Sequence, residues 1–332
     1  MDHDDQHRRA LRSLIPGLLL SGTAVVALVV VADPARALQV LMTASPTELA
    51  AAAVVSVLSL IARAAASREL VDRRVGLAGA FAALNIGYLA NNLLPLRAGE
   101  AARSVVLGRR SGLGIVGGAA AVAAERLLDV MLAATILIAA LPAVGVDAGW
   151  AAPAAAAGAA MAGVTVLLVV ARRRELIIAW LEPKLAPRPR LAALLPRLEA
   201  GFDGLAKPRR LLLAACWLGL SWLLAVIFFW LVLRAFVPEA PPEWAAFGIG
   251  VLAFGIALPS SPGAIGVYEA ALVGALALCG VASADALAFA VASHALSFSI
   301  TSVCGLVALI RQVPGGAGIA DRARSLVGSR EN

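Results

Sequence analysis

Three charged residues lie inside one long apolar stretch of this 332-residue sequence. Glu125, Arg126 and Asp129 fall near the middle of the segment Leu113–Leu141. If the segment is a helix, residues three or four positions apart share a face, so Asp129 is expected to meet both Arg126 and Glu125. A charged side chain at bilayer depth costs about 3 kcal/mol or more unless it is paired or hydrated. This trio is therefore a candidate polar site.

Two carboxylates facing one arginine leave a negative charge that another segment must balance. Either Arg97 or Arg103, which follow a proline break, is the expected partner. The same groups have two interpretations that the sequence leaves open. They form an intramembrane ion-pair network that locks helix packing, or they form a binding site within the membrane.

The apolar chain is broken twice by proline and glycine, in corresponding ways. One break passes from Leu94-Pro95 through Gly99 to Glu100, and the other from Leu258-Pro259 through Ser261-Pro262-Gly263 and Gly266 to Glu269. Paired interruptions of this kind are typical of an inverted repeat with a binding site at the membrane midplane. The other interpretation is that the breaks are packing kinks.

The breaks also predict an anion site. Ser261 suits an N-cap and Pro262 a first helical position, so a helix is expected to start there and point its N-terminus into the membrane. A helix starting near Leu96 would do the same from the other side. Unpaired N–H groups and the helix dipole favour an anion, and with Arg97 and Arg103 nearby that anion is a phosphate. In a membrane, phosphate belongs to a lipid headgroup or a lipid-linked precursor.

The residues expected to bind the substrate are Arg97, Glu100, Arg103, Glu125, Arg126, Asp129, Ser261, Gly263 and Glu269. Asn91 and Asn92 are expected to bridge helices by hydrogen bonds. Tyr268 is a lesser candidate. His294 is interpreted first as a helix-packing residue and second as a proton acceptor.

Composition sets the class of protein that must position these residues. Hydrophobic residues make up 61% of the chain, charged residues 15%, and the mean hydropathy is +0.88. A soluble domain is about half apolar and a quarter charged, so a soluble enzyme is excluded. The net charge of +7 comes from arginines clustered between apolar stretches, a pattern that indicates membrane topology rather than nucleic-acid binding.

The elements are therefore expected to be membrane helices, and the fold class is all-α. Full spans are predicted over about residues 14–32, 47–62, 113–141, 151–170, 211–236 and 284–310, with broken hairpins over 75–107 and 244–280. About six full spans plus two re-entrant hairpins, entering from opposite sides, place both termini in the cytoplasm. Eight full crossings would place the termini on the same side as well.

A single integral membrane domain is expected over residues 1–332. Within it, residues 171–210 form a basic cytoplasmic loop whose prolines favour surface helices over a compact domain, and residues 311–332 form a cytoplasmic tail. Neither a disulfide framework nor a metal site is predicted from Cys216, Cys279 and Cys304, which all lie in apolar stretches.

These motifs, in this order, resemble the lysylphosphatidylglycerol synthase transmembrane, or flippase-like, family. The likeness rests on Asn92-Leu93-Leu94-Pro95 with Arg97, Gly99-Glu100 and Arg103, on Glu125-Arg126 with Asp129, and on Pro259 with Pro262-Gly263, Gly266 and Glu269. The resemblance implies that two-domain members translocate aminoacylated phosphatidylglycerol through this region. Because Asn332 follows soon after the last predicted span, the synthase part is expected to be absent.

Two functions follow as expectations. The first is a flippase for a phospholipid or polyprenyl-phosphate lipid in the cytoplasmic membrane, acting without a cofactor and possessing no ATP-binding motif. The second is a membrane enzyme or accessory subunit in polyprenyl-linked glycan or aminoacyl-lipid metabolism. The expected partners are the lipid, the membrane and a separate synthase or glycosyltransferase, and nucleic acid is not among them.

Overall fold

The structure is a computed structural model that describes residue 17 and residues 19–71, 73–94, 98–145, 151–185, 194–196, 199, 206–257 and 260–311. Within these residues the regular elements are helices, as predicted. They are a helix over Leu19–Val31, then α2 (Pro34–Met42), α3 (Pro46–Leu70), α4 (Leu77–Leu93), α5 (Ala98–Ser111), α6 (Gly114–Ala139), η1 (Leu141–Val144), α7 (Ala151–Arg172), α8 (Arg174–Leu185), α11 (Pro208–Arg234), α12 (Pro242–Gly255), η2 (Pro262–Ala264), α13 (Val267–Leu278) and α14 (Ser283–Ile310).

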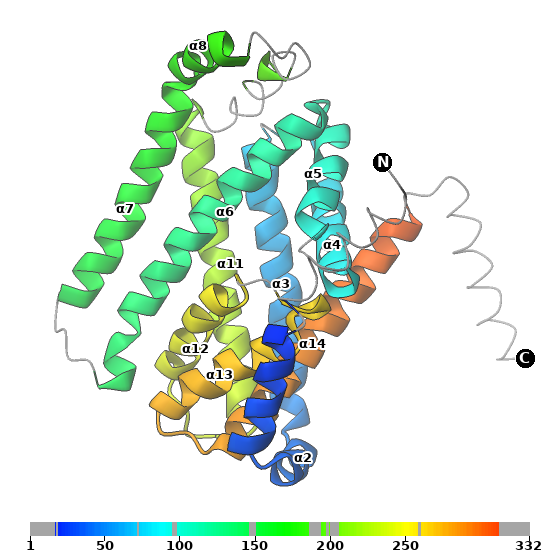
Figure 1. The fold of residues 1–332 in the computed structure, drawn as a ribbon, viewed down its shortest axis with the longest axis vertical. Coiled ribbons are helices and arrows are strands. Elements are labelled where there is room, and N and C mark those ends of the chain that lie inside the picture. The colour runs from blue at the N-terminus through cyan, green and yellow to red at the C-terminus, as the bar shows by residue number, and fades with distance from the viewer. Residues whose placement is uncertain are drawn as a thin grey trace, which may run out of the picture.

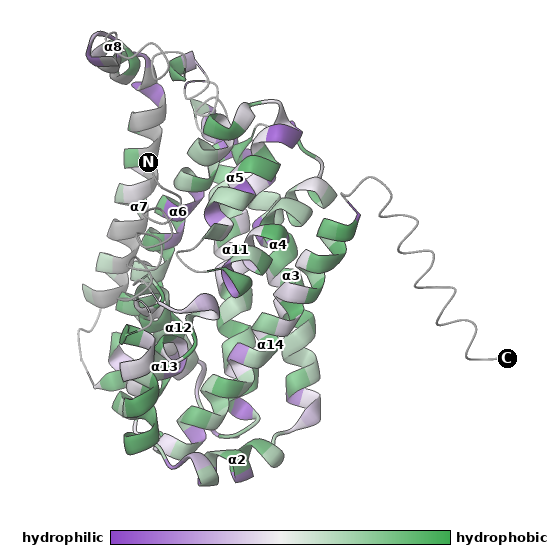
Figure 2. Ribbon diagram, turned by 45° about the vertical axis from the view of Figure 1, so that its right-hand side comes forward, coloured by the Kyte–Doolittle hydropathy of each residue, from purple (hydrophilic) through white to green (hydrophobic). Residues whose placement is uncertain are grey.

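The long helices run side by side in one bundle (Figure 1). Three of them, α3, α11 and α14, are long and apolar enough to cross a membrane, and a fourth span is possible if the Leu19–Val31 helix and α2, bent by 82°, count as one. At 26 residues α6 is long enough too, but it carries three charges in its middle. Figure 2 shows hydrophobic residues along most of the helices, interrupted by hydrophilic ones on α5 and α6.

The bundle is held together at its centre by α3 and α11, which pack along much of their length. The Ser59 hydroxyl of α3 donates a hydrogen bond to the Ser221 carbonyl of α11 at 2.9 Å. Leu60, Leu218 and Val232 belong to the buried core that these helices share with α4, α13 and α14. Membrane helices associate by close van der Waals packing and interhelical hydrogen bonds, so this seam is a stable frame for the charged residues beside it.

The two helices of the α4–α5 hairpin pack against each other at very short range. A Cβ atom at Gly99 would run into the Gly87 carbonyl oxygen and the Asn91 side chain. The Gly99 N–H instead donates to Asn91 Oδ1 at 2.8 Å. The absence of a side chain at Gly99 therefore lets the start of α5 lie directly on α4, where it faces α6.

The basic segment 171–210 contains one well-defined helix among its described residues, α8, which Figure 1 shows turned across the end of α7. Its Trp180 is 61% exposed, and Lys184 Nζ lies 3.0 Å above the Trp180 ring. An exposed aromatic residue with a cation beside it suits the membrane–water boundary.

Candidate functional site

A group of six charged side chains lies where α3, α5 and α6 meet, and we call it the charge cluster. It consists of Arg63 of α3, Glu100 and Arg103 of α5, and Glu125, Arg126 and Asp129 of α6. Three arginines face three carboxylates, so the cluster is balanced in charge. Five of the nine residues predicted to bind the substrate belong to it.

The centre of the cluster is the pair of Arg103 and Glu125, which are 2% and 1% exposed. Arg103 Nη2 donates to Glu125 Oε2, and to Ser67 Oγ of α3. The Ser67 hydroxyl donates to the same Glu125 oxygen at 2.7 Å. The prediction that Arg103 balances the spare carboxylate of α6 is thus confirmed. Desolvating such a pair is costly, and it is tolerated only where each partner keeps good hydrogen bonds.

Asp129 joins three helices. It accepts hydrogen bonds from Arg126 Nη1 at 3.0 Å, from Trp222 Nε1 of α11 at 2.9 Å, and from Arg63 Nη2 of α3. The expected pairing of Arg126 and Asp129 on one face is confirmed. Arg63 also lies against Glu125, with Nε 3.3 Å from Oε1, so it bridges both carboxylates.

Arg63 corrects the sequence-based topology. The second span was predicted to end near Ala62, with Arg63 in the cytoplasmic basic cluster. The helix continues to Leu70, because Arg63 turns inward to the carboxylates of α6 rather than outward to water. A run of small residues, Ala64 to Ser67, is buried just beyond it. That run is the sequence signal that a packed helix continues past the arginine.

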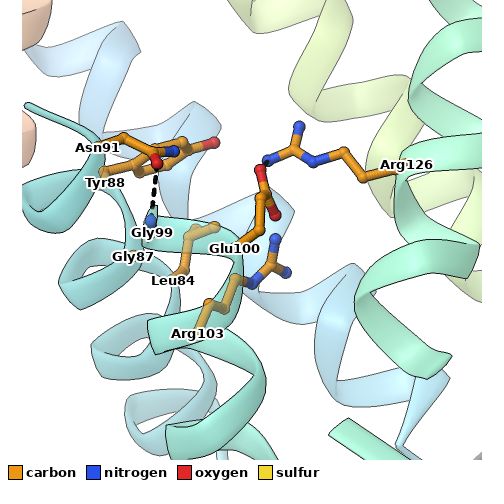
Figure 3. Close-up of a pocket in the computed structure, with 8 residues that line it drawn as sticks. All are labelled: Leu84, Gly87, Tyr88, Asn91, Gly99, Glu100, Arg103 and Arg126. Atoms are coloured by element: carbon orange, nitrogen blue, oxygen red, sulfur yellow. Dashed lines mark hydrogen bonds and ion pairs between the residues drawn. The ribbon is translucent and has the colours of Figure 1, made fainter. Parts of the chain in front are cut away.

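One edge of the cluster borders a small pocket between α4, α5 and α6, which is too narrow in this structure to admit a water molecule (Figure 3). The side chains of Tyr88 and Asn91 on α4, Glu100 and Arg103 on α5, and Arg126 on α6 line it. Arg126 Nη2 is 2.6 Å from Glu100 Oε1, and these two side chains are 38% and 31% exposed. The pocket is therefore walled by charges of both signs.

Several of these charged atoms have no hydrogen-bond partner within the described part of the chain. They are Arg103 Nη1, Arg126 Nε and Glu100 Oε2. A buried guanidinium N–H without an acceptor is costly, by about 1–3 kcal/mol. In a native structure such a group calls for an explanation, such as an ordered water or a bound ion that supplies the acceptor. An oxyanion suits Arg103 Nη1, since guanidinium groups bind phosphate and carboxylate oxygens.

The second break differs from its prediction. Ser261 and Pro262 start the short turn η2 instead of the helix, and Ser261 makes no cap hydrogen bond. Its hydroxyl donates to the Ile265 carbonyl at 3.2 Å, and its N–H donates to Ser21 Oγ at 3.0 Å. Positive φ angles at Gly263 (68°) and Gly266 (86°) interrupt a right-handed helix. The helix after the break, α13, therefore starts at Val267.

Glu269 occupies the start of α13 itself. Its Oε2 accepts the Gly266 N–H at 2.7 Å, and its Oε1 lies 2.6 Å from His294 Nδ1 of α14. One N–H group at this helix start, where a substrate anion was predicted to bind, is thus satisfied by the protein's own carboxylate. At the other hairpin the Gly99 N–H is likewise taken by Asn91. The unpaired donors that line the pocket in the described structure are arginine side chains.

The two broken segments nevertheless meet, because η2 packs against α4. The Gly263 Cα lies beside the Phe298 ring of α14 and the Asn92 carbonyl, which a Cβ would approach to 3.2 and 3.7 Å. Asn92 Nδ2 donates to Thr301 Oγ1 at 3.1 Å and to Ser302 Oγ at 2.9 Å. The prediction that Asn92 bridges helices is confirmed.

Three of the predicted site residues remain apart from the charge cluster. Ser261 and Gly263 lie in the turn beside Asn92, and Glu269 pairs with His294. Arg97 and Pro259 lie outside the described residues. Residues that the sequence did not single out are Arg63, Ser67 and Trp222, whose contacts cross from helices distant in sequence.

Comparison with known proteins places this site in a family. The family model described as lysylphosphatidylglycerol synthase TM region matches residues 14–305. A protein named glycosyltransferase AglD, from Haloferax volcanii, is 29% identical over 370 aligned residues, which cover 96% of this chain and 58% of that protein. The chain thus spans little more than half of this relative's length. No solved structure matches the chain.

Proposed function

The chain belongs to the lysylphosphatidylglycerol synthase TM-region family, and from this premise we propose that it moves a phospholipid or a lipid-linked phosphate between the leaflets of the membrane. It is a multi-pass membrane protein with a lipid-related function. The finer proposal is that the lipid's phosphate crosses through the pocket at the charge cluster. No cofactor takes part in this proposal.

The observation that carries the proposal is Arg103. Its Nη2 is bound by Glu125 and Ser67, which fix the guanidinium in place. Its Nη1 has no hydrogen-bond partner among the described residues, and the side chain lines the pocket. A guanidinium whose Nη2 is fixed by hydrogen bonds and whose Nη1 has no partner is pre-organised to bind an oxyanion.

The partly exposed pair of Glu100 and Arg126 suggests how a phosphate enters. An arriving phosphate competes with Glu100 for Arg126, while Asp129 remains a second partner of the guanidinium. Exchange of one oxyanion for another thus keeps Arg126 paired throughout. Translocation requires that the lipid bind strongly enough to enter the site and weakly enough to leave it.

The remaining architecture is part of the same proposal. The two broken segments would be re-entrant, related as an inverted repeat, within about six full spans. The turn η2 of the second segment packs against α4 of the first, which supports a single site between them. A cytoplasmic-membrane location, cytoplasmic termini, one domain over residues 1–332, a cytoplasmic loop over 171–210 and a cytoplasmic tail over 311–332 complete it. Arg97, Ser261 and Gly263 remain proposed contacts at the tips.

A second candidate function rests on the relative named as a glycosyltransferase. In that case the chain would be a membrane enzyme or an accessory subunit for a separate synthase or glycosyltransferase, acting on a lipid-linked substrate. Product formation by the purified chain alone, without lipid movement, would favour this function.

Translocation is tested by replacing Arg126. In proteoliposomes with a fluorescent phospholipid, loss of inner-leaflet fluorescence to an added quencher measures movement. We expect Arg126→Gln to slow movement about tenfold or more, because a hydrogen bond to a charged group contributes about 1.5–3 kcal/mol. Arg234→Gln is a matched control, since its side chain is also 38% exposed and pairs with Glu48 at 3.4 Å.

Equal rates for wild type, Arg126→Gln and Arg234→Gln, at equal incorporation, would contradict the site. A rate for wild type no faster than that of protein-free vesicles, for any phosphate-bearing lipid, would contradict translocation itself.

A further inference from the structure

A second polar site lies apart from the charge cluster, on the floor of an apolar groove. The groove has a volume of about 280 Å³ and runs between the Leu19–Val31 helix, α13 and α14. Its lining is apolar apart from Glu269, and includes Val25, Leu28, Ile265 and Leu287. A carboxylate in such surroundings is costly to keep, so it is a candidate for a function.

Glu269 does more than cap α13. One oxygen, Oε2, is sufficient for the cap, where it accepts the Gly266 N–H at 2.7 Å. The other, Oε1, holds His294 Nδ1 at 2.6 Å, a contact that no cap requires. The two side chains are only 12% and 13% exposed, and the Tyr268 ring stacks on the imidazole at 4.1 Å. This pair is held on several sides, and Glu269 lines the groove.

In the described structure Tyr268 is a titratable side chain in contact with the pair, its ring stacked on the imidazole of His294. The helix over Leu19–Val31 carries no titratable residue. The other titratable residues on the elements packed against α13 and α14 are Asp33, Arg36, Glu48, Arg63, Arg68, Glu69, Tyr88, Arg209, Arg210, Cys216, Arg234, Glu243, Cys279, Asp285 and Cys304.

We propose that Glu269 and His294 form a proton-binding site that couples lipid movement to a proton gradient. This inference rests on the proposed translocation. Nδ1 faces Glu269, so a proton enters and leaves at Nε2 of the imidazole. Binding of one proton changes the pair from a net charge of −1 to 0, and imidazole is the side chain that makes this change between about pH 5 and 8. In an apolar groove a change of one charge alters the stability of the surrounding packing.

A physical connection joins this pair to the lipid site through α14. The ring of Phe298, one turn after His294, lies edge-on to the imidazole at 6.4 Å. The same ring touches η2 at Gly263, and η2 packs on α4 beside Asn92, which follows Asn91 of the lipid pocket. Protonation of His294 therefore acts on the element where both hairpin tips meet.

The first test reads the proton directly. The sequence contains three histidines, and the other two are His3 and His7. In a His3→Gln/His7→Gln background, nitrogen NMR of the full chain in nanodiscs reports one imidazole. We expect one titration within about pH 5–8 that changes in Glu269→Gln and stays the same in Tyr268→Phe. An imidazole that stays neutral throughout this range would overturn the proposal, whatever the transport data show.

The second test measures coupling as the distribution of lipid between the two leaflets. In proteoliposomes with fluorescent phosphatidylglycerol and a gradient of one pH unit, one proton per lipid predicts a leaflet ratio of about ten at steady state. An ionophore that collapses the gradient should return the ratio to unity. We expect a ratio of unity in His294→Gln and in Glu269→Gln, whose amide oxygen keeps the cap, and the wild-type ratio in Tyr268→Phe.

The outcomes separate the two proposals. Lipid movement with a ratio that ignores the gradient in wild type overturns the coupling and leaves translocation intact. Absence of movement for every phosphate-bearing probe overturns the proposed function and the coupling with it.

Discussion

Replacement of Arg103 by glutamine is expected to cost about 3–5 kcal/mol of stability, because it leaves the buried carboxylate of Glu125 short of a partner. Arg103 and Glu125 are nearly inaccessible, and Ser67 binds both of them. Thermal or detergent-induced unfolding of the purified protein measures the loss. No other charged pair in the described structure is as deeply buried on both sides.

The double variant Arg103→Gln/Glu125→Gln separates folding from function. Removing both charges removes the uncompensated carboxylate, so most of the lost stability should return. Movement of a phosphate-bearing lipid should not return, because the unpaired Nη1 donor is gone. A double variant that moves lipid at the wild-type rate would show that Arg103 only locks the helices. One that remains as unstable as the single variant would contradict the ion-pair account.

Replacement of Arg63 by glutamine is expected to have a stability cost of similar size, again about 3–5 kcal/mol. Arg63 bridges Glu125 and Asp129 from α3, and its side chain is 12% exposed. Its loss leaves three carboxylates against two arginines in the cluster. The seam between α3 and α6 should loosen first, since Arg63 is the cation that α3 contributes to it.

Arg73→Gln is the control for Arg63→Gln. Arg73 also forms an ion pair, at 2.7 Å to Glu69, but its side chain is 49% exposed. Arg210 Nη1 also holds Glu69, at 3.2 Å to Oε2, so loss of Arg73 leaves this carboxylate paired and should cost less than loss of Arg63. Melting temperatures of the two variants in the same detergent make the comparison. Equal shifts in melting temperature would mean that burial does not determine how much each ion pair contributes to stability.

The sequence predicted the elements of the fold well where hydropathy is unbroken. The spans expected over 211–236 and 284–310 correspond to α11 and α14, which begin at Pro208 and Ser283. The pairing of Arg126 with Asp129 followed from their spacing on a helix. Local spacing and local hydropathy are sufficient for such features, because the contacts lie within one element.

Features that depend on distant contacts were predicted less well. The partners of Arg63 are Glu125 and Asp129, which lie 62 and 66 residues further along the chain. The local sequence does not show these contacts, so Arg63 was placed beyond the end of the span predicted over 47–62. The start of α13 was misplaced because Gly263 and Gly266 adopt left-handed angles against Phe298 and Ser21. Neither contact is visible in the local sequence, where Ser261-Pro262 is a good helix start.

Glu269 illustrates the same limit at the candidate site. The sequence grouped it with the substrate-binding residues, whereas the structure places it apart from the charge cluster, at an apolar groove. The sequence did not show that it caps its own helix and pairs with His294, 25 residues later. As a result, one N–H group at this helix N-terminus, where an anion was predicted to bind, is occupied by Glu269 itself.

The central claim is that the charge cluster conducts a lipid by its phosphate, and one comparison tests it most directly. Wild-type proteoliposomes are loaded in parallel with fluorescent phosphatidylglycerol and with a fluorescent glycosyl diacylglycerol that lacks phosphate. We predict movement of the phosphate-bearing lipid and at least about tenfold slower movement of the other, the difference that one charged hydrogen bond supplies. Equal movement of both lipids, or movement of the phosphate-free lipid alone, would contradict the account.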